Sequence, residues 1–341
     1  MPSAPAPLAR EPSSAFMPHK KEEVKESIGL YQRIKNVVYY AFLPLIASYN
    51  FIHAENLVTK KREFWFLPTS FEKLLGEWYF SSAVNQNNGK CPDREKTQMA
   101  KEIFNNLEKH VKRTDLKYKF VVTDSNKVNA FALPQRVAIN KGIINAVQKY
   151  CERKGYDNNM FKAMVAAVLG HEITHSDARH SARILELLLL LNVVVIGSKI
   201  YLSAKNLISN KSQKDERFTS HDLLEILFNF VSNLVVKLYM LLGSRSHEYE
   251  ADKYGMYMMT KAGYDPEGAI KLQEFFQEKF ETPKGWIAKI QEFVSTHPMT
   301  AKRLEENKKT LQAIKNDPEL KSQIEKIEEA KKAALPAAVG A

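Results

Sequence analysis

Hydrophobic residues recur at helical spacing on both sides of a short polar motif in the middle of the chain. Before the motif, apolar side chains stand three or four positions apart, at Phe161, Met164, Val165, Val168 and Leu169. Residues at this spacing share one face of an α-helix, so the pattern indicates a helix that is packed against a core. The apolar run continues after the motif, and we therefore predict one buried helix over Phe161–Leu191.

Two short segments before this helix have the character of β-strands. Lys119–Asp124 and Val128–Leu133 are rich in β-branched and aromatic residues, and the turn-like pair Ser125-Asn126 separates them. Helical spacing appears on either side, over Thr97–Arg113 and Gly142–Cys151. The pattern therefore predicts an α+β fold that is mainly helical, with a small β-sheet beside the long helix.

Three apolar segments raise the question of a membrane. Asn36–Ile52 carries no charge but is barely long enough for a bilayer core, which takes about 20 apolar residues. It suits a short membrane anchor, the core of a signal peptide, or a buried helix broken near Pro44. Leu187–Ser198 is shorter, and charges interrupt Leu223–Leu242, so both suit a buried helical hairpin or helices on a bilayer surface.

Composition divides the chain into four parts. Residues 1–30 are rich in Pro, Ala and Ser and are expected to be disordered, and residues 31–58 form the anchor or signal-like segment. Residues 90–310 hold most of the predicted elements, including a helix that starts after the turn Gly263–Pro266. Residues 311–341 form a charged helical tail.

The net charge of +11 favours contact with an anionic surface. No nucleic-acid-binding motif accompanies this charge, and basic residues are interleaved with acidic ones, so we expect a solvated or membrane-facing surface and no nucleic-acid partner. The two cysteines, Cys91 and Cys151, form no CxxC pair, which argues against a cysteine zinc site. Their positions leave a single disulfide between them open.

The polar motif inside the long helix, His171–His180, reads HEITHSDARH. His171 and His175 lie about 40° apart around a helix, so both can bind one metal ion, with Glu172 beside them as a candidate base. This is the HExxH signature of zinc peptidases. Burying such side chains costs free energy unless they are paired or bind a metal, which favours a metal site over a core histidine pair. On a continuous helix His180 faces away from the metal, so we expect it to make a structural hydrogen bond.

A catalytic zinc needs a third protein ligand and an open position for water. Ala178 and Ser181 stand where the motif HExxHxxGxxH requires Gly and His, which excludes that ligand set. An acidic residue on another helix remains. Glu248 and Asp252 are four residues apart and share a helix face, whereas Glu250 points elsewhere. From the residues alone, a ligand role for Glu248 and a solvated charged helix are equally open.

Four motifs occur in the order found in one family of HExxH zinc metallopeptidases. They are NAFALP (Asn129–Pro134), HEITHSDARH (His171–His180), SRSHEYEAD (Ser244–Asp252) and STHPMTAKR (Ser295–Arg303). The chain resembles this family, which includes HtpX, BepA, the mitochondrial overlapping-activity protease and the CAAX prenyl endopeptidases. The resemblance covers residues 100–305 and implies a zincin-type, gluzincin-like fold. One departure is Gln135-Arg136, where many members have a Gly-Gly turn.

The resemblance also implies a ligand set. It makes Glu248 the third ligand of one Zn²⁺ per chain, beside His171 and His175, and it makes Asp252 a residue that orients a ligand. Zinc held in this way polarises the scissile carbonyl and lowers the pKa of its bound water. Glu172 would accept the proton of that water as it attacks.

In the family, a histidine of the HP motif lies near the metal, and it corresponds to His297. The resemblance implies that His297 stabilises the tetrahedral oxyanion by a hydrogen bond. The sequence also allows a simpler interpretation. His297-Pro298 can be the start of a helix, with Thr296 as its cap and proline in its first turn.

Substrate binding is expected at the NAFALP segment. An exposed edge strand can pair with an extended polypeptide through backbone hydrogen bonds, and we assign this role to Asn129, Ala130 and Phe131. The alternative is that Val128–Leu133 is a core strand.

We predict that residues 90–310 form a zinc-dependent endopeptidase domain that hydrolyses protein substrates. The resemblance implies membrane-associated protein quality control, in a bacterial envelope or an organelle inner membrane. One alternative is a CAAX-type prenyl-protein endopeptidase, which ranks lower because the chain lacks several long apolar spans. Another is a non-catalytic scaffold or chaperone that retains the fold, and a third is a charge-driven lipid- or nucleic-acid-binding protein. The pattern does not indicate an oligomeric state.

Overall fold

The computed structural model describes residues 53–65, 67–184, 186, 245–280, 297 and 301–334. The chain divides into two compact units, Met1–Ala54 and Glu55–Ala341. The fold reported below is that of the second unit. Residues 1–30 and the apolar segments Asn36–Ile52, Leu187–Ser198 and Leu223–Leu242 lie outside the described residues.

No helix among the described residues is both long and apolar enough to cross a bilayer.

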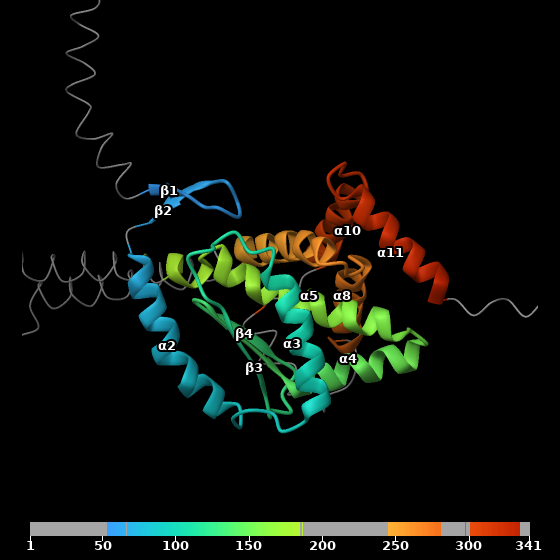
Figure 1. Cartoon of the computed structure of the whole chain (residues 1–341), viewed down its shortest axis with the longest axis horizontal. Coiled ribbons are helices and arrows are strands. Elements are labelled where there is room, and N and C mark those ends of the chain that lie inside the picture. Colours follow the sequence, from blue (N-terminus) through green and yellow to red (C-terminus); the bar gives the residue numbers. More distant parts are fainter. Residues whose placement is uncertain are drawn as a thin grey trace, which may run out of the picture. The chain divides into compact units, whose positions relative to one another are not determined.

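Helices dominate the described part of the chain, and the strands are short (Figure 1). In chain order the elements are β1 (His53–Glu55), β2 (Arg62–Phe64), α2 (Thr69–Gln86), α3 (Arg94–Glu108), β3 (Lys119–Thr123), β4 (Ala130–Leu133), β5 (Arg136–Asn140), α4 (Lys141–Lys154), α5 (Asn158–Asp177), α8 (Glu267–Phe280), α10 (Ala301–Lys315) and α11 (Lys321–Ala334). Residues 245–261 are also helical. The predicted α+β class, mainly helical with a small sheet beside the motif helix, is confirmed.

The larger sheet has three strands in the order β3-β5-β4. The central strand β5 pairs in parallel with β3 and antiparallel with β4, so β4 is an edge strand in the described part of the chain. The sequence analysis predicted β3 and β4 but missed β5. The hairpin between β4 and β5 turns at Gln135, which adopts a φ of 55°. Gln135 therefore supplies the left-handed conformation that glycine usually provides at such a turn.

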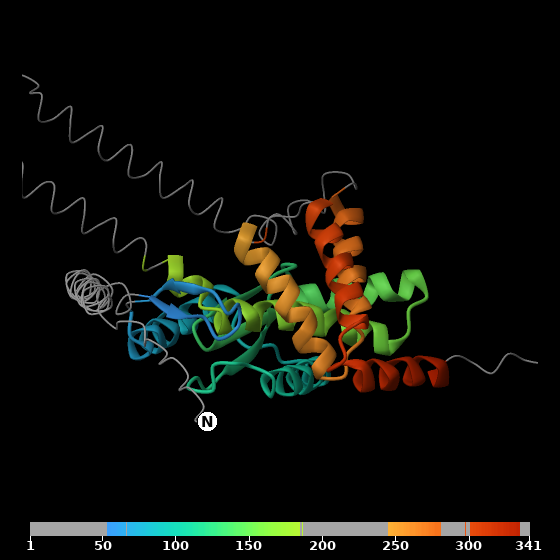
Figure 2. The same ribbon diagram turned by 90° about the horizontal axis from the view of Figure 1, so that it is seen from above.

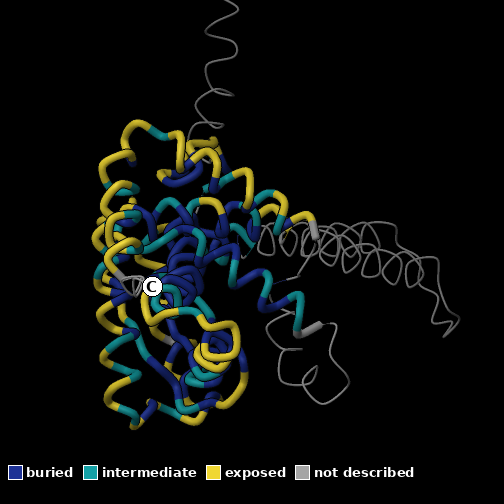
Figure 3. The backbone as a smooth tube through the Cα atoms, turned by 90° about the vertical axis from the view of Figure 1, so that its right-hand side faces the viewer, coloured by how far each residue is buried: buried dark blue, intermediate teal, exposed yellow. Residues whose placement is uncertain are grey.

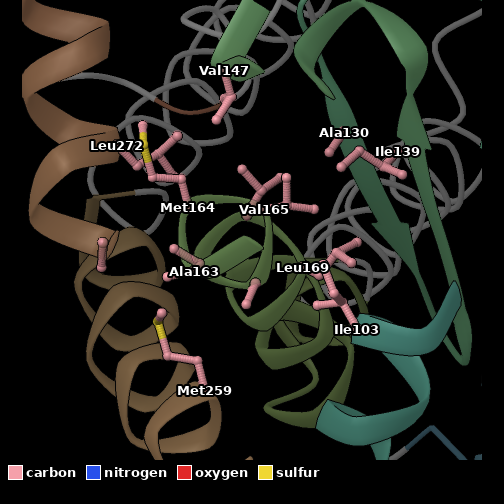
Figure 4. Close-up of a cluster of buried hydrophobic side chains, with 14 of the residues drawn as sticks. Ile103, Ala130, Ile139, Val147, Ala163, Met164, Val165, Leu169, Met259 and Leu272 are labelled. Atoms are coloured by element: carbon pink, nitrogen blue, oxygen red, sulfur yellow. The ribbon is translucent and has the colours of Figure 1, made fainter. Parts of the chain in front are cut away.

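Helix α5 is the centre of the domain. Asp157 caps its start by accepting a hydrogen bond from the Met160 amide, and the helix packs against α3, α4, α8 and β4. Figure 3 shows the buried backbone gathered in the interior, with the exposed residues on the surrounding helices. Figure 4 shows Val165 and Leu169 directed towards the sheet and α3, and Met164 towards Leu272 of α8. The predicted apolar face of this helix is therefore part of the hydrophobic core.

Two helices cross α5 at close range, and a glycine lies at each crossing. Helix 245–261 (orange) crosses α5 (yellow-green in Figure 2), and there Gly170 meets Gly255. A Cβ atom on Gly170 would lie 2.9 Å from the Gly255 carbonyl oxygen. At a second crossing, a Cβ on Gly268 of α8 would lie 2.6 Å from the carbonyl carbon of Ala163. The absence of side chains lets the backbones approach this closely.

The prediction of one continuous helix over Phe161–Leu191 is wrong. Helix α5 ends at Asp177, a turn follows, and residues 180–184 are helical again. Arg179 in this turn has a φ of 60°. Its buried guanidinium lies between two carboxylates, with Arg179 Nε 2.7 Å from Glu72 Oε1 and Nη2 3.0 Å from Glu186 Oε1. These contacts hold a non-glycine residue in the left-handed region, which ends the helix.

Other expectations agree with the structure at the level of element type. Helix α3 covers most of Thr97–Arg113, and α8 begins directly after Pro266, as predicted. Cys91 and Cys151 are both buried and free, so no disulfide joins them.

Candidate metal centre

The last two turns of α5 place the HExxH side chains on one side of the helix. His171 and Glu172 are buried, and His175 is partly buried. The Nε2 atoms of His171 and His175 lie 3.0 Å apart. The four-residue spacing therefore produces the convergence of imidazoles that the sequence analysis expected.

Glu248 reaches this pair from helix 245–261. Its Oε2 lies 3.2 Å from His171 Nε2, and its Oε1 lies 3.2 Å from His175 Nε2. The Gly170–Gly255 crossing sits next to His171, and it brings the helix that carries Glu248 against α5. Glu248 is 2% exposed. Of the two interpretations left open for Glu248, the solvated surface residue is excluded.

His297 joins the same cluster. Its Nδ1 lies 3.1 Å from Glu248 Oε1 and 3.2 Å from His171 Nε2. Its other ring nitrogen, Nε2, lies 3.4 Å from Glu172 Oε1. His171, His175, Glu248 and His297 each offer one atom to a group in which all atoms lie within 4.8 Å of one another. Thr296 and Pro298 lie outside the described residues.

Asp252 lies behind His171, on the side away from the cluster. Its Oδ1 accepts a hydrogen bond from His171 Nδ1 at 2.9 Å. Arg303 of α10 binds the same carboxylate twice, through Nε and Nη2, both at 2.7 Å. Arg303 also contacts Glu248, with Nη1 3.0 Å from Oε2. The sequence analysis included Arg303 in a motif but gave it no role, because its contacts join two helices that are distant in sequence.

His180 lies behind His175, and this arrangement was not expected. The turn at residues 178–179 brings His180 Nδ1 to 2.8 Å from His175 Nδ1. His180 Nε2 lies 3.2 Å from Glu250 Oε2. The expected structural hydrogen bond exists, but the premise that His180 faces away from the site is wrong, because the helix is not continuous there.

Glu172 is the glutamate of the HExxH motif. It is 1% exposed, and its Oε1 accepts no hydrogen bond from any described residue. Its Oε1 lies 3.4 Å from His297 Nε2. A buried carboxylate oxygen without a donor is costly, which suggests that it has a partner during function.

The charges in the cluster shift several pKa values. Burial lowers the pKa of His171, but Glu248 and Asp252 outweigh this effect and raise it to about 10. Burial lowers the pKa of His175 to about 4. For Glu248, burial acts to raise the pKa, and the neighbouring His297 and His171 override it, so the pKa falls well below its ordinary value. The carboxylates of Glu248 and Asp252 thus favour a positive charge at His171.

The residues assigned to substrate binding lie at the edge strand. Ala130 and Phe131 belong to β4, and Asn129 directly precedes it. The side chains of Asn129 and Ala130 are buried, whereas Phe131 is partly exposed. Strand β4 packs on α5, the helix that carries the HExxH motif. The edge position agrees with the sequence analysis, and any substrate contact by Asn129 or Ala130 would involve their backbone.

The distances within the cluster suit a metal ion. Donor atoms about 2.0–2.1 Å from a tetrahedral zinc ion are about 3.3 Å from one another. The pairs formed by His171, His175 and Glu248 measure 3.0, 3.2 and 3.2 Å. Two imidazoles and one carboxylate are a donor set that proteins use for zinc. The cluster can therefore bind a metal ion.

Comparisons with known proteins place these motifs in a family. The sequence model described as Peptidase family M48 matches residues 94–311. The mitochondrial metalloendopeptidase OMA1 of Schizosaccharomyces pombe is 28% identical over 272 residues, which are 78% of this chain and 69% of that protein. The beta-barrel assembly-enhancing protease of Yersinia pestis is 24% identical over 259 residues, 74% of this chain and 46% of that protein. The mitochondrial metalloendopeptidase OMA1 of Arabidopsis thaliana is 27% identical over 189 residues, 55% of this chain and 30% of that protein.

The chain thus spans less than half the length of two of these relatives. The resemblance that the four motifs indicated is confirmed, and it makes the protein a metalloendopeptidase that acts on polypeptides. Because the matched range 94–311 covers more than half of the chain and contains the whole donor cluster, the protein belongs to peptidase family M48.

Proposed function

We propose that the metal of this endopeptidase is one zinc ion, bound by His171, His175 and Glu248. The observation that carries the proposal is the convergence of two Nε2 atoms and one carboxylate next to Glu172, at distances that suit tetrahedral zinc. When bound there, zinc would polarise a scissile carbonyl and lower the pKa of a bound water. Asp252 holds the ring of His171 in place from behind.

Glu172 serves as the general base in this proposal. A buried carboxylate with an unsatisfied Oε1 can accept a proton from an attacking water and pass it to the leaving amine. The contact with His297 Nε2 at 3.4 Å places a second proton carrier beside it. Among the described residues, His297 is the only basic residue that forms an ion-pair contact with Glu172.

The position of His297 bears on two parts of this proposal. Its Nδ1 lies among the donor atoms, where it can take the fourth position that a catalytic site keeps for water. For hydrolysis the ring must leave that position. We propose that it then donates a hydrogen bond to the oxyanion of the tetrahedral intermediate, as the family resemblance implied.

The substrate binds as an extended polypeptide along the edge of the sheet. Among the described strands β4 pairs with β5 alone, so its other edge offers backbone groups for pairing. Backbone pairing requires no particular side chain, which suits an endopeptidase that accepts many protein sequences. Asn129, Ala130 and Phe131 are the residues of this contact.

We place the enzyme at a membrane, in protein quality control. The net charge of +11 favours an anionic surface, and Asn36–Ile52 is an uncharged apolar segment. One relative is named as mitochondrial and another as enhancing β-barrel assembly, and both are proteases. A non-catalytic scaffold would have lost a ligand or the base, whereas all of these residues are present here.

Elemental analysis together with a cleavage assay tests the proposed function. The purified full-length protein should contain one zinc ion per chain and should cleave casein. Chelation should abolish cleavage, and added zinc should restore it. Purified protein without zinc, or cleavage that survives complete removal of metal, would contradict the proposal.

A further inference from the structure

The two candidate histidine ligands are supported from behind in different ways. Both turn Nε2 towards the donor cluster and Nδ1 away from it. His171 Nδ1 meets a carboxylate directly, at Asp252. His175 Nδ1 instead meets His180 Nδ1 at 2.8 Å, and His180 Nε2 in turn meets Glu250 Oε2 at 3.2 Å. A second histidine thus stands between His175 and its carboxylate.

The hydrogen-bond roles along this chain follow from Glu250. Its carboxylate can only accept, so His180 Nε2 must carry a proton. His180 Nδ1 and His175 Nδ1 lie 2.8 Å apart, so one of them donates a hydrogen bond and the other accepts it. As a metal ligand, His175 must keep the lone pair on Nε2, so it carries its proton on Nδ1 and donates it to His180. That lone pair faces the donor cluster, where a metal ligand requires it.

Two basic side chains also hold Glu250 in place. Lys61 Nζ lies 2.7 Å from Oε1, and Arg183 Nη1 lies 3.1 Å from Oε2. Arg183 also reaches Glu63, with Nη2 3.2 Å from Oε1. Basic side chains thus hold both carboxylates behind the ligands in place. Lys61 and Arg183 contact Glu250, and Arg303 contacts Asp252.

His180 itself is fixed by packing. Its ring stacks on His247, with ring centroids 4.3 Å apart and an interplanar angle of 6°. A flat stacked contact and two in-plane hydrogen bonds leave the imidazole little freedom to rotate.

We propose that His180 and Glu250 are positioning residues for metal binding, which act through a Glu250–His180–His175 hydrogen-bond relay. The relay fixes the tautomer and ring orientation of His175, while Lys61 connects it to the segment between β1 and β2. This inference rests on the proposed zinc site. Removing such supporting partners typically weakens metal affinity by about 10–100-fold.

Zinc affinity of the metal-stripped full-length protein tests the relay, measured by competition with a chelating dye. His180→Phe keeps a stacked ring but removes both nitrogens, and His247→Phe makes the same change in the other ring of the stack. Affinity should fall about 10–100-fold in His180→Phe and stay unchanged in His247→Phe. Glu250→Gln keeps the size of the side chain but weakens the acceptor, and it should show a smaller loss. Thermal unfolding of each metal-free protein reports folding separately.

Each outcome decides the matter. Wild-type affinity in both His180→Phe and Glu250→Gln overturns the relay, and so does an equal loss in His180→Phe and His247→Phe, since packing alone would explain it. If His180→Phe does not fold, the affinity of Glu250→Gln decides. A wild-type protein that binds no zinc would overturn the proposed zinc site itself, which separates that failure from a failure of the relay.

Discussion

Gly170 and Gly255 face each other where α5 crosses helix 245–261, one residue before the first histidine of the HExxH motif. A Cβ atom on Gly255 would lie 2.9 Å from the backbone nitrogen of His171. The distance between Glu248 and the two histidines therefore depends on a contact between two glycines.

Gly255→Ala should lower both stability and zinc affinity. The added methyl group must push the helices apart, and overpacking of this kind typically costs about 1–3 kcal/mol. The same displacement moves Glu248 away from His171 and His175. Thermal unfolding and zinc titration measure the two effects. Gly268→Ala is the matched control, because it overfills the α5–α8 crossing, which carries no candidate ligand. A normal zinc affinity in Gly255→Ala would show that the crossing does not set the ligand geometry.

Glu172→Gln should lower kcat by at least about 10²–10⁴-fold while zinc content and fold are retained, since the amide keeps the shape but cannot accept a proton. Glu248→Gln is the contrasting variant and should lose zinc and activity together. Casein cleavage and elemental analysis on the same preparations separate the two roles. Substantial turnover by Glu172→Gln, or loss of its zinc, would contradict the assignment of Glu172 as the base.

The parts of the site that were predictable depend on local spacing. His171 and His175 lie on one helix, so the four-residue interval alone brings their Nε2 atoms together. Glu248 could not be placed in this way. Its position depends on a helix crossing between residues that are far apart in sequence. The residues alone left its role open, and the family resemblance selected the ligand role.

The wrong prediction for the direction of His180 shows why other parts of the fold and the site were not predicted. Helical periodicity continues past Asp177, but Arg179 leaves the helix because Glu72 and Glu186 bind its guanidinium. Glu72 lies 107 residues away in the sequence, so helical periodicity does not reveal this contact. Strand β5 was missed for a similar reason. It follows a tight turn without glycine, at Gln135, and its terminal residues Arg136 and Asn140 are polar although they are buried.

Removal of Arg303 should make the metal-free protein less stable and more sensitive to acid. Burial acts to raise the pKa of Asp252, but Arg303 overrides this and lowers it to about 2, from an ordinary value of 3.8. The stability linked to this carboxylate is therefore fully present above pH 3.8 and is lost as the pH falls through about 2. Without Arg303 that loss should occur at higher pH.

Arg303→Gln should also cost about 3–5 kcal/mol at neutral pH, because it leaves Asp252 and Glu248 buried without their cation. Acid titration monitored by circular dichroism and denaturant unfolding measure the two effects. Lys302→Gln removes the same charge from an exposed neighbour and is the matched control. Equal behaviour of the two variants would indicate that only net charge matters.

The full-length protein should sediment with membranes and resist carbonate extraction through Asn36–Ile52. Transfer of an apolar, uncharged segment of this length from water into a bilayer lowers the free energy. Deleting residues 1–54, which correspond to the smaller compact unit, should release the protein. A full-length protein that is monodisperse in buffer without detergent would contradict this expectation.

His297→Ala should lower kcat by about 10²–10³-fold with little change in KM, if the ring donates to the oxyanion only after substrate has bound. Three ligands remain, so zinc should be retained. Because Nδ1 of His297 lies among the donor atoms, removal of the ring could also change kcat in the opposite direction. A rise in kcat would mean that His297 acts chiefly by occupying the water position, and the oxyanion role would be wrong. A helix-start role instead predicts a lower melting temperature with near-normal kcat of the folded fraction. Measuring kcat, zinc content and thermal unfolding on one preparation distinguishes these three outcomes.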